Sequence, residues 1–294
     1  MTAAAAGRPA RAGAGQAPVR WNRSAGTQAQ VARSARRRKN LELALAWLVP
    51  VAFVAAWQAV SKAGWVNQQF FPAPSVVWDT GVDMAKDGVL WDNLSISLTR
   101  VLLGFVIGSA AGSLVGLAMG VSSLLRAALD PLLTALYMVP KLALLPLLLL
   151  IFGLGETPLV IQISITTFFF MWLSTMAAFS AVPAGYREVA RSFHANPWQQ
   201  FRHVLLPAAL PEIFVGLRMT IGVAVLVMVG IEFVQASSGI GWLIWNSWQL
   251  FLAPQMYVGI VVVSLVGVVL TWIIRMLGYL AMPWERHTGK KARF

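Results

Sequence analysis

The stretch LSISLTRVLLGFVIGSAAGSLVGLAMG, residues 94–120, decides the fold of this chain. As an α-helix rising 1.5 Å per residue, it is long enough to cross the roughly 30 Å hydrocarbon core of a bilayer. Arg100 is the one charged residue within it. A long, apolar, nearly uncharged run of this kind predicts a transmembrane helix.

Small residues form a regular pattern within this stretch. A glycine occurs at every fourth position, so one stripe of the helix has no side chains and another backbone can approach it closely. The stripe consists of Gly104, Gly108, Gly112, Gly116 and Gly120. The pattern predicts tight helix packing, either within one subunit or across a dimer.

The composition extends this conclusion to the whole chain. Of the 294 residues, 58% are hydrophobic and only 12% are charged, against about 25% charged in ordinary globular proteins. The mean hydropathy is +0.69. Further apolar runs span residues 43–60, 128–151, 157–180, 208–232 and 257–281, and none alternates like a barrel strand. We therefore expect an all-α polytopic membrane protein with six transmembrane helices.

The basic residues report the orientation. The net charge is +12, and nine Lys or Arg residues precede Leu41 in a segment without acids. Residues 1–40 and 287–294 are therefore expected to be basic cytosolic tails, the first one disordered, on either side of a transmembrane domain at 41–286. A signal peptide is the alternative for the first apolar run, but that run is longer than a typical h-region. This asymmetry explains the positive charge without a nucleic-acid partner.

Several kinds of chemistry are excluded by composition. The chain has no cysteine and only three histidines, without an HExxH motif, so a metal site or a thiol nucleophile is not expected. The spans contain no His, no Cys and no paired carboxylates. We do not expect an enzyme.

A polar segment at residues 183–206 interrupts the apolar pattern. Asn196 is a good N-cap and Pro197 suits the first helical position, while Pro183 can open a preceding helix, so two short helices with a turn near Ala195 are expected. Val189 lies four residues before Phe193 and forms an apolar edge with it, flanked by Arg187, Glu188 and Arg191. This edge either docks into the groove of a partner or packs on its own bundle.

The same segment carries a recognisable motif. The permeases of ABC importers share a signature of Glu-Ala-Ala, three residues, Gly, nine residues, Ile, one residue and Leu-Pro. This chain has Glu188-Val189-Ala190, His194, Val204 and Leu206-Pro207 at that spacing. It resembles that family over residues 41–286, and most closely the branch that imports sulfonates, taurine or nitrate, through further matches at residues 71–75, 139–147, 152–156 and 236–243.

The resemblance implies a function and partners. The loop would be a coupling helix seated in a cytosolic ATPase, with the coupling positions Glu188, Val189, Ala190, Phe193, His194, Leu206 and Pro207. His194 departs from the family's glycine. The chain has no Gly-x-x-x-x-Gly-Lys-Ser/Thr loop, so ATP and Mg would bind a separate ATPase dimer, and this chain would hold no cofactor. The other expected partners are a second permease copy, forming a homodimer, and an extracytoplasmic solute-binding protein, all at a bacterial inner membrane.

Charged residues inside the spans suggest a translocation pathway. Arg100, Lys141 and Arg218 lie roughly 10–20 Å from a span end, and Glu232 is the one acid placed comparably. Such residues usually face the protein interior or a water-filled cavity. Pro140 and Pro146 around Lys141 fit a broken helix that lines a cavity. We hypothesise a net positive cavity that passes a small anion; a structural role is the alternative for Lys141 and Arg218.

Two further interpretations stay open. Trp242, Trp245 and Trp248, in the predicted outer loop at 234–255, form either an interfacial aromatic belt or a re-entrant gate. An ion-gradient-driven carrier or channel is the alternative function. It would leave the motif at residues 188–207 unexplained.

Overall fold

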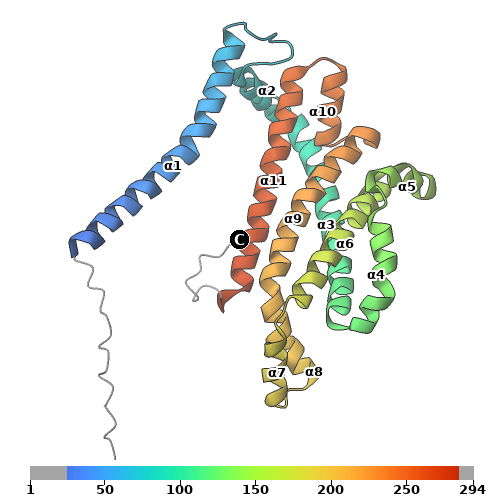
Figure 1. Cartoon of the computed structure of the whole chain (residues 1–294). Coiled ribbons are helices and arrows are strands. Elements are labelled where there is room, and N and C mark those ends of the chain that lie inside the picture. The colour runs from blue at the N-terminus through green and yellow to red at the C-terminus, as the bar shows by residue number, and fades with distance from the viewer. Residues whose placement is uncertain (1–24, 285–294) are drawn as a thin grey trace, which may run out of the picture. The chain divides into compact units, whose positions relative to one another are not determined.

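The computed structural model describes residues 25–284, and every regular element in that range is a helix (Figure 1). The chain divides into two compact units, Met1–Ala56 and Trp57–Phe294. Most of helix α1 (Ala25–Lys62) belongs to the first unit, and its Leu41–Lys62 part is long and apolar enough to cross a membrane.

The start of α1 differs from the expectation of a disordered tail up to residue 40. Residues 25–40 are helical, and they are rich in Ala, Gln and Arg, which have high intrinsic helix propensity. The rest of that segment, 1–24, and the expected tail at 287–294 lie outside the described residues.

The second unit contains the remaining helices. Some are long and apolar, and shorter helices connect them. In chain order they are α2 (Pro74–Lys86), α3 (Val89–Val121), α4 (Ser123–Tyr137), the 3₁₀ helix η1 (Lys141–Leu144), α5 (Leu145–Phe152), α6 (Glu156–Ser180), α7 (Ala184–Ser192), α8 (Pro197–Gln200), the π-helix η2 (Phe201–Leu205), α9 (Leu206–Gln235), α10 (Ile240–Gln249) and α11 (Ala253–Ala281).

Within the described residues, five helices are each long and apolar enough to cross a membrane. A sixth candidate is a bent pair, Ser123–Tyr137 with Lys141–Phe152, whose two parts meet at 82°. The span expected at 128–151 is therefore a broken one, as the prolines on either side of Lys141 indicated. The helix breaks at Pro140, which has no backbone N–H and which restricts the residue before it to extended conformations.

The glycine stripe of α3 lies directly against α6. A Cβ atom at Gly104 would sit 2.6 Å from the Cβ of Ile163, and one at Gly116 would sit 2.5 Å from the carbonyl oxygen of Trp172. The hydroxyl of Thr167 in α6 donates a hydrogen bond of 3.1 Å to the carbonyl of Gly104. The five glycines thus bring two helices of one chain into backbone contact.

Buried apolar side chains join the long helices around this pair. One core cluster includes Val101 and Phe105 of α3, Ile163 of α6 and Ile221 and Met228 of α9. A second cluster joins α2, the start of α3, α10 and α11. Two charged residues, Arg100 of α3 and Glu232 of α9, are buried in the same two helices.

Candidate functional site

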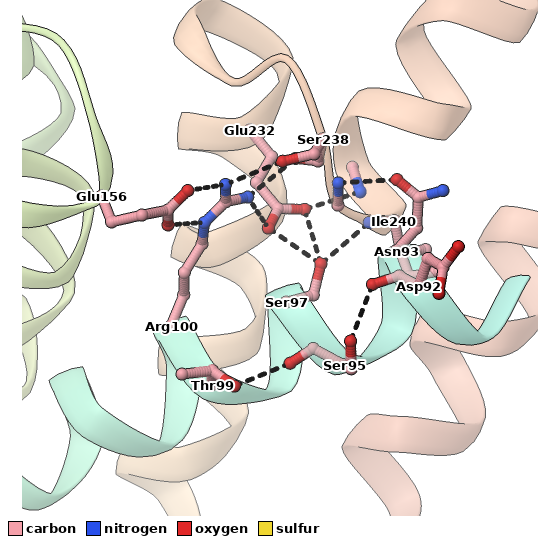
Figure 2. Close-up of polar contacts among 12 residues, drawn as sticks. Asp92, Asn93, Ser95, Ser97, Thr99, Arg100, Glu156, Glu232, Ser238 and Ile240 are labelled. Carbon is pink, nitrogen blue, oxygen red and sulfur yellow. Dashed lines mark hydrogen bonds and ion pairs between the residues drawn. The ribbon is translucent and has the colours of Figure 1, made fainter. Parts of the chain in front are cut away.

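Arg100 of α3 is at the centre of a buried ion-pair network (Figure 2). Its guanidinium donates two hydrogen bonds to the carboxylate of Glu156, of 2.5 and 2.7 Å, and a third of 2.7 Å to Glu232. Arg100 is 2% exposed and Glu232 is fully buried, whereas the Glu156 side chain is 61% exposed. The network therefore ties α3 to the first turn of α6 and to the far end of α9.

Glu232 receives donors on both carboxylate oxygens. Oε1 accepts from Arg100, Oε2 accepts at 2.7 Å from the backbone N–H of Gly241, and the Ser97 hydroxyl lies within 2.9 Å of both oxygens. A buried carboxylate is tolerated only when its lone pairs are satisfied in this way. Glu232 of α9 is thus fixed by three donors from two other segments, α3 and the start of α10.

The loop between α9 and α10 closes over the network. Arg100 also donates to the carbonyl of Ser238 at 2.8 Å, and the N–H groups of Gly239 and Ile240 bond to Asn93 and Ser97 of α3. Gly239 has φ +108°, and a Cβ there would lie 2.5 Å from Glu232 Oε1 and 2.7 Å from Arg100 Nη1. Only glycine allows the backbone to approach these charges so closely.

The two short helices expected in the loop are present as α7 and α8. Asn196 caps α8, with Asn196 and Gln199 forming a reciprocal capping box and Pro197 in the first turn. Ala190 is buried, while Val189 is 58% exposed and Phe193 81% exposed. Glu188 is exposed beside them. The loop therefore holds a folded shape with an uncovered apolar edge.

His194, at the glycine position of the motif, has φ 55°. This left-handed conformation is the one that glycine adopts without strain, and histidine tolerates it better than β-branched residues do. The N–H of His194 bonds to the carbonyl of Arg191 and that of Ala195 to the carbonyl of Ala190, which ends α7. His194 thus adopts a backbone conformation that a glycine at this position would also allow.

Leu206 and Pro207, the end of the motif, form the first turn of α9 and are half-buried. Leu206 packs against the cluster of Ala178, Phe179 and Leu205. This cluster connects the loop to the end of α6. Side-chain packing therefore connects the end of the loop to α6 and α9.

Lys141 lies at the break between α4 and α5. Its ammonium group is 4.1 Å from the ring centre of Tyr137 and 5.1 Å from that of Phe169, and it donates to the Tyr137 carbonyl. The Gln162 side chain of α6 donates to the Lys141 carbonyl at 2.5 Å. Side chains thus replace backbone hydrogen bonds that the break removes.

Arg218 lies apart from these groups. It lines a largely apolar cavity of about 540 Å³ between α9 and α11, together with Arg275, and it forms no ion pair within residues 25–284. The structure therefore pairs Arg100 with Glu232, whereas Lys141 and Arg218 take no part in that network.

Sequence reasoning missed Glu156, Ser97, Asn93 and Ser238 as partners of the intramembrane charges. Glu156 was placed one residue outside its span, and the others are uncharged. The sequence nevertheless contains one indication of these partners, because an arginine inside an apolar span usually pairs with an acid. Glu156 and Glu232 were the acids at the ends of neighbouring spans.

The fold and the loop define a class of protein. A bundle of apolar helices joined through tightly packed glycines, with a folded two-helix loop that leaves an apolar edge uncovered, defines a multi-pass membrane protein with a surface suited to a partner. Comparison with known proteins gives the family.

The chain belongs to the family described as "Binding-protein-dependent transport system inner membrane component", which matches residues 104–279. It is 33% identical over 259 residues to SsuC of Bacillus subtilis (strain 168), a permease protein assigned to aliphatic sulfonate transport; the match covers 88% of this chain and 94% of that one. It is 31% identical to the nitrate import permease protein NrtB of Synechococcus elongatus, over 80% and 88% of the two chains.

A solved structure shares the fold. The crystal structure of an amino acid ABC transporter with histidines superposes with a TM-score of 0.50 at 19% identity, over 69% of this chain and 97% of that one. The chain is thus the permease subunit of an ABC importer, a multi-pass protein of the inner membrane. ATP hydrolysis in such importers belongs to a separate subunit.

Proposed function

We propose that this chain, as a homodimer, imports a small anion by alternating access, driven by a cytosolic ATPase dimer that binds the α7–α8 loop. The observation that carries the coupling part is the uncovered edge of α7, where Val189 and Phe193 are exposed on a loop whose helices are capped and whose turn is ordered. An apolar edge of this kind favours a groove on a partner.

Both termini and the loop at 183–206 are assigned to the cytosol, with six spans if the bent α4–α5 pair counts as one. The concentration of Lys and Arg in these segments supports this orientation. It also places the α9–α10 loop and Glu156 toward the outer face, where an extracytoplasmic binding protein would deliver the solute.

The anionic substrate is supported by the relatives and by the charges. Aliphatic sulfonates and nitrate, named for the relatives, are both small oxyanions. Lys141 and Arg218 have no carboxylate partner in the described part of the chain, so their charge is available to a passing anion. Arg100 and Glu232 are instead assigned to holding the outer ends of α3, α6 and α9 together, because Arg100 is already neutralised.

The pathway assignment is tested by uptake in proteoliposomes that contain the permease, its ATPase and its binding protein. Lys141→Gln and Arg218→Gln, combined, should lower the maximal uptake rate of a sulfonate or nitrate and leave ATPase binding intact. Lys86→Gln, which removes an exposed surface charge, is the matched control. Unimpaired anion uptake by the double variant would overturn the assignment.

The coupling assignment is tested by co-purification of the ATPase. Phe193→Asp and Glu188→Arg should each weaken ATPase association while the permease still inserts, because an unpaired charge in a docking groove is not compensated. His203→Asp places the same carboxylate at an exposed position elsewhere in the loop and should not. Normal ATPase recruitment by both loop variants would show that the α7 edge is not the docking site.

A further inference from the structure

A cavity lined by two arginines lies at the C-terminal end of α3, away from the Arg100 network near the N-terminal end of that helix. It has a volume of about 600 Å³ and is formed where α3 ends, α4 begins, α6 ends and α7 begins. Its lining includes Arg126, Arg187, Ser123 and Ser180, and no carboxylate is among the lining residues that the structure describes. The cavity is thus positively charged and mainly polar.

Arg126 and Arg187 each have N–H groups that form no described hydrogen bond. Arg126 donates from Nε and Nη2 to the carbonyls of Met119 and Gly120 at the end of α3, at 3.0 and 3.2 Å, which leaves Nη1 without a described partner. The Nε atom of Arg187 is buried and has no hydrogen-bond partner among residues 25–284. A buried donor left unpaired costs about 1–3 kcal/mol, so a ligand that accepts from it is stabilised.

The backbone adds to the positive potential. Helix α4 is fifteen residues long and α7 nine residues long, and both begin at this cavity. Ser122 caps only the N–H of Leu125 in α4, and Pro183 gives α7 no side-chain cap. The free N–H groups of two first turns therefore accompany the two guanidinium groups, which together suit an oxyanion.

We propose that this cavity binds a phosphate-bearing anion between Arg126 and Arg187. The planar donor fork of arginine matches phosphate oxygens. The cavity lies at the ends of two transmembrane helices, so the phosphate can belong to an anionic lipid headgroup or to a free phosphate ion. By bridging Arg126 and Arg187, the anion fixes α7, and with it the edge at Val189 and Phe193, to the corner between α3 and α4.

The test uses the full-length chain in a detergent without phosphate, with two probes: inorganic phosphate and short-chain phosphatidylglycerol. Short-chain phosphatidylcholine, which has no net charge, is the reference. Saturable binding of either probe is expected, and the probe that binds identifies the source. Arg187→Gln should weaken it about tenfold, which corresponds to about 1.4 kcal/mol. Arg202→Gln, at an exposed arginine outside the cavity, should bind as the wild type does.

Two further measurements keep the test decisive. Arg187→Lys keeps the charge but loses the fork and should give intermediate affinity. Amide hydrogen exchange at residues 184–192 should slow when the binding probe is added to the wild type but not to Arg187→Gln. Neither measurement depends on the transported solute, so a failure here leaves the proposed transport function untouched.

Two results would overturn the proposal. The first is that neither probe binds better than phosphatidylcholine; if Arg187→Gln then also loses ATPase association, Arg187 acts at the contact with the ATPase instead. The second is that Arg126→Gln and Arg187→Gln both bind like the wild type.

Discussion

Replacing Glu232 by glutamine should destabilise the protein by about 3 kcal/mol. Both carboxylate oxygens of Glu232 accept from buried donors, Oε1 from Arg100 and Oε2 from the N–H of Gly241. A glutamine must turn its NH₂ group toward either Arg100 or the N–H of Gly241. In both orientations two hydrogen-bond donors then face each other and one hydrogen bond is lost. The loss of one charged hydrogen bond, about 1.5–3 kcal/mol, adds to the cost of the donor left unpaired, about 1–3 kcal/mol, and partial relaxation reduces the sum.

Glu156→Gln is the matched control, because it changes the same group and disturbs the same guanidinium. Its side chain is 61% exposed, so water can solvate both the unpaired donor and the amide, and the expected loss is about 1 kcal/mol or less. Unfolding midpoints in mixed micelles of increasing denaturing detergent would measure both variants. The reasoning is refuted if Glu156→Gln is at least as destabilising as Glu232→Gln, or if Glu232→Gln unfolds at the wild-type midpoint.

Three more outcomes are expected. Gly112→Leu should cost at least about 2 kcal/mol in the same unfolding assay, because α6 backbone occupies the space. Gly222→Ala, inside α9 and with no described atom within 4 Å, should cost nothing and should gain up to about 1 kcal/mol from helix propensity; equal losses would contradict the packing account. His194→Gly should raise stability by about 0.5 kcal/mol, as relief of the left-handed strain exceeds the added chain entropy, and should keep ATPase binding in co-purification; a clear loss of stability would show that the His194 side chain matters. Reporter fusions at Gly185 and after Arg293 should both report a cytosolic location, and an outward one for either would reject the six-span orientation.

Local sequence patterns, namely apolar runs and helix caps, predicted much of the fold. The apolar runs gave the long helices of the bundle to within a few residues at most ends, because length and the absence of charge suffice in lipid. The cap at Asn196 and Pro197 correctly indicated a second short helix in the loop. These features depend on residues within one or two helical turns of each other, and the printed sequence shows them directly.

Features that depend on distant residues were not predictable in the same way. The partners of Arg100 lie 56 and 132 residues away, and a search along one helix finds neither. Pro140 indicated a break, but neither the 82° angle nor the contacts of Lys141 with Gln162 and Tyr137 at the break follow from the local sequence. Residues 25–40 are helical, and their content of Ala, Gln and Arg favours a helix although the segment has no periodic apolar pattern.

The most direct test of the coupling account is the ATP dependence of uptake in proteoliposomes containing the permease, its ATPase and its binding protein. We expect sulfonate or nitrate to accumulate only when ATP is supplied to the ATPase side, and Phe193→Asp to abolish that accumulation while the permease remains inserted. Accumulation driven by an ion gradient without ATP, or ATP-driven uptake unchanged by Phe193→Asp, would contradict it.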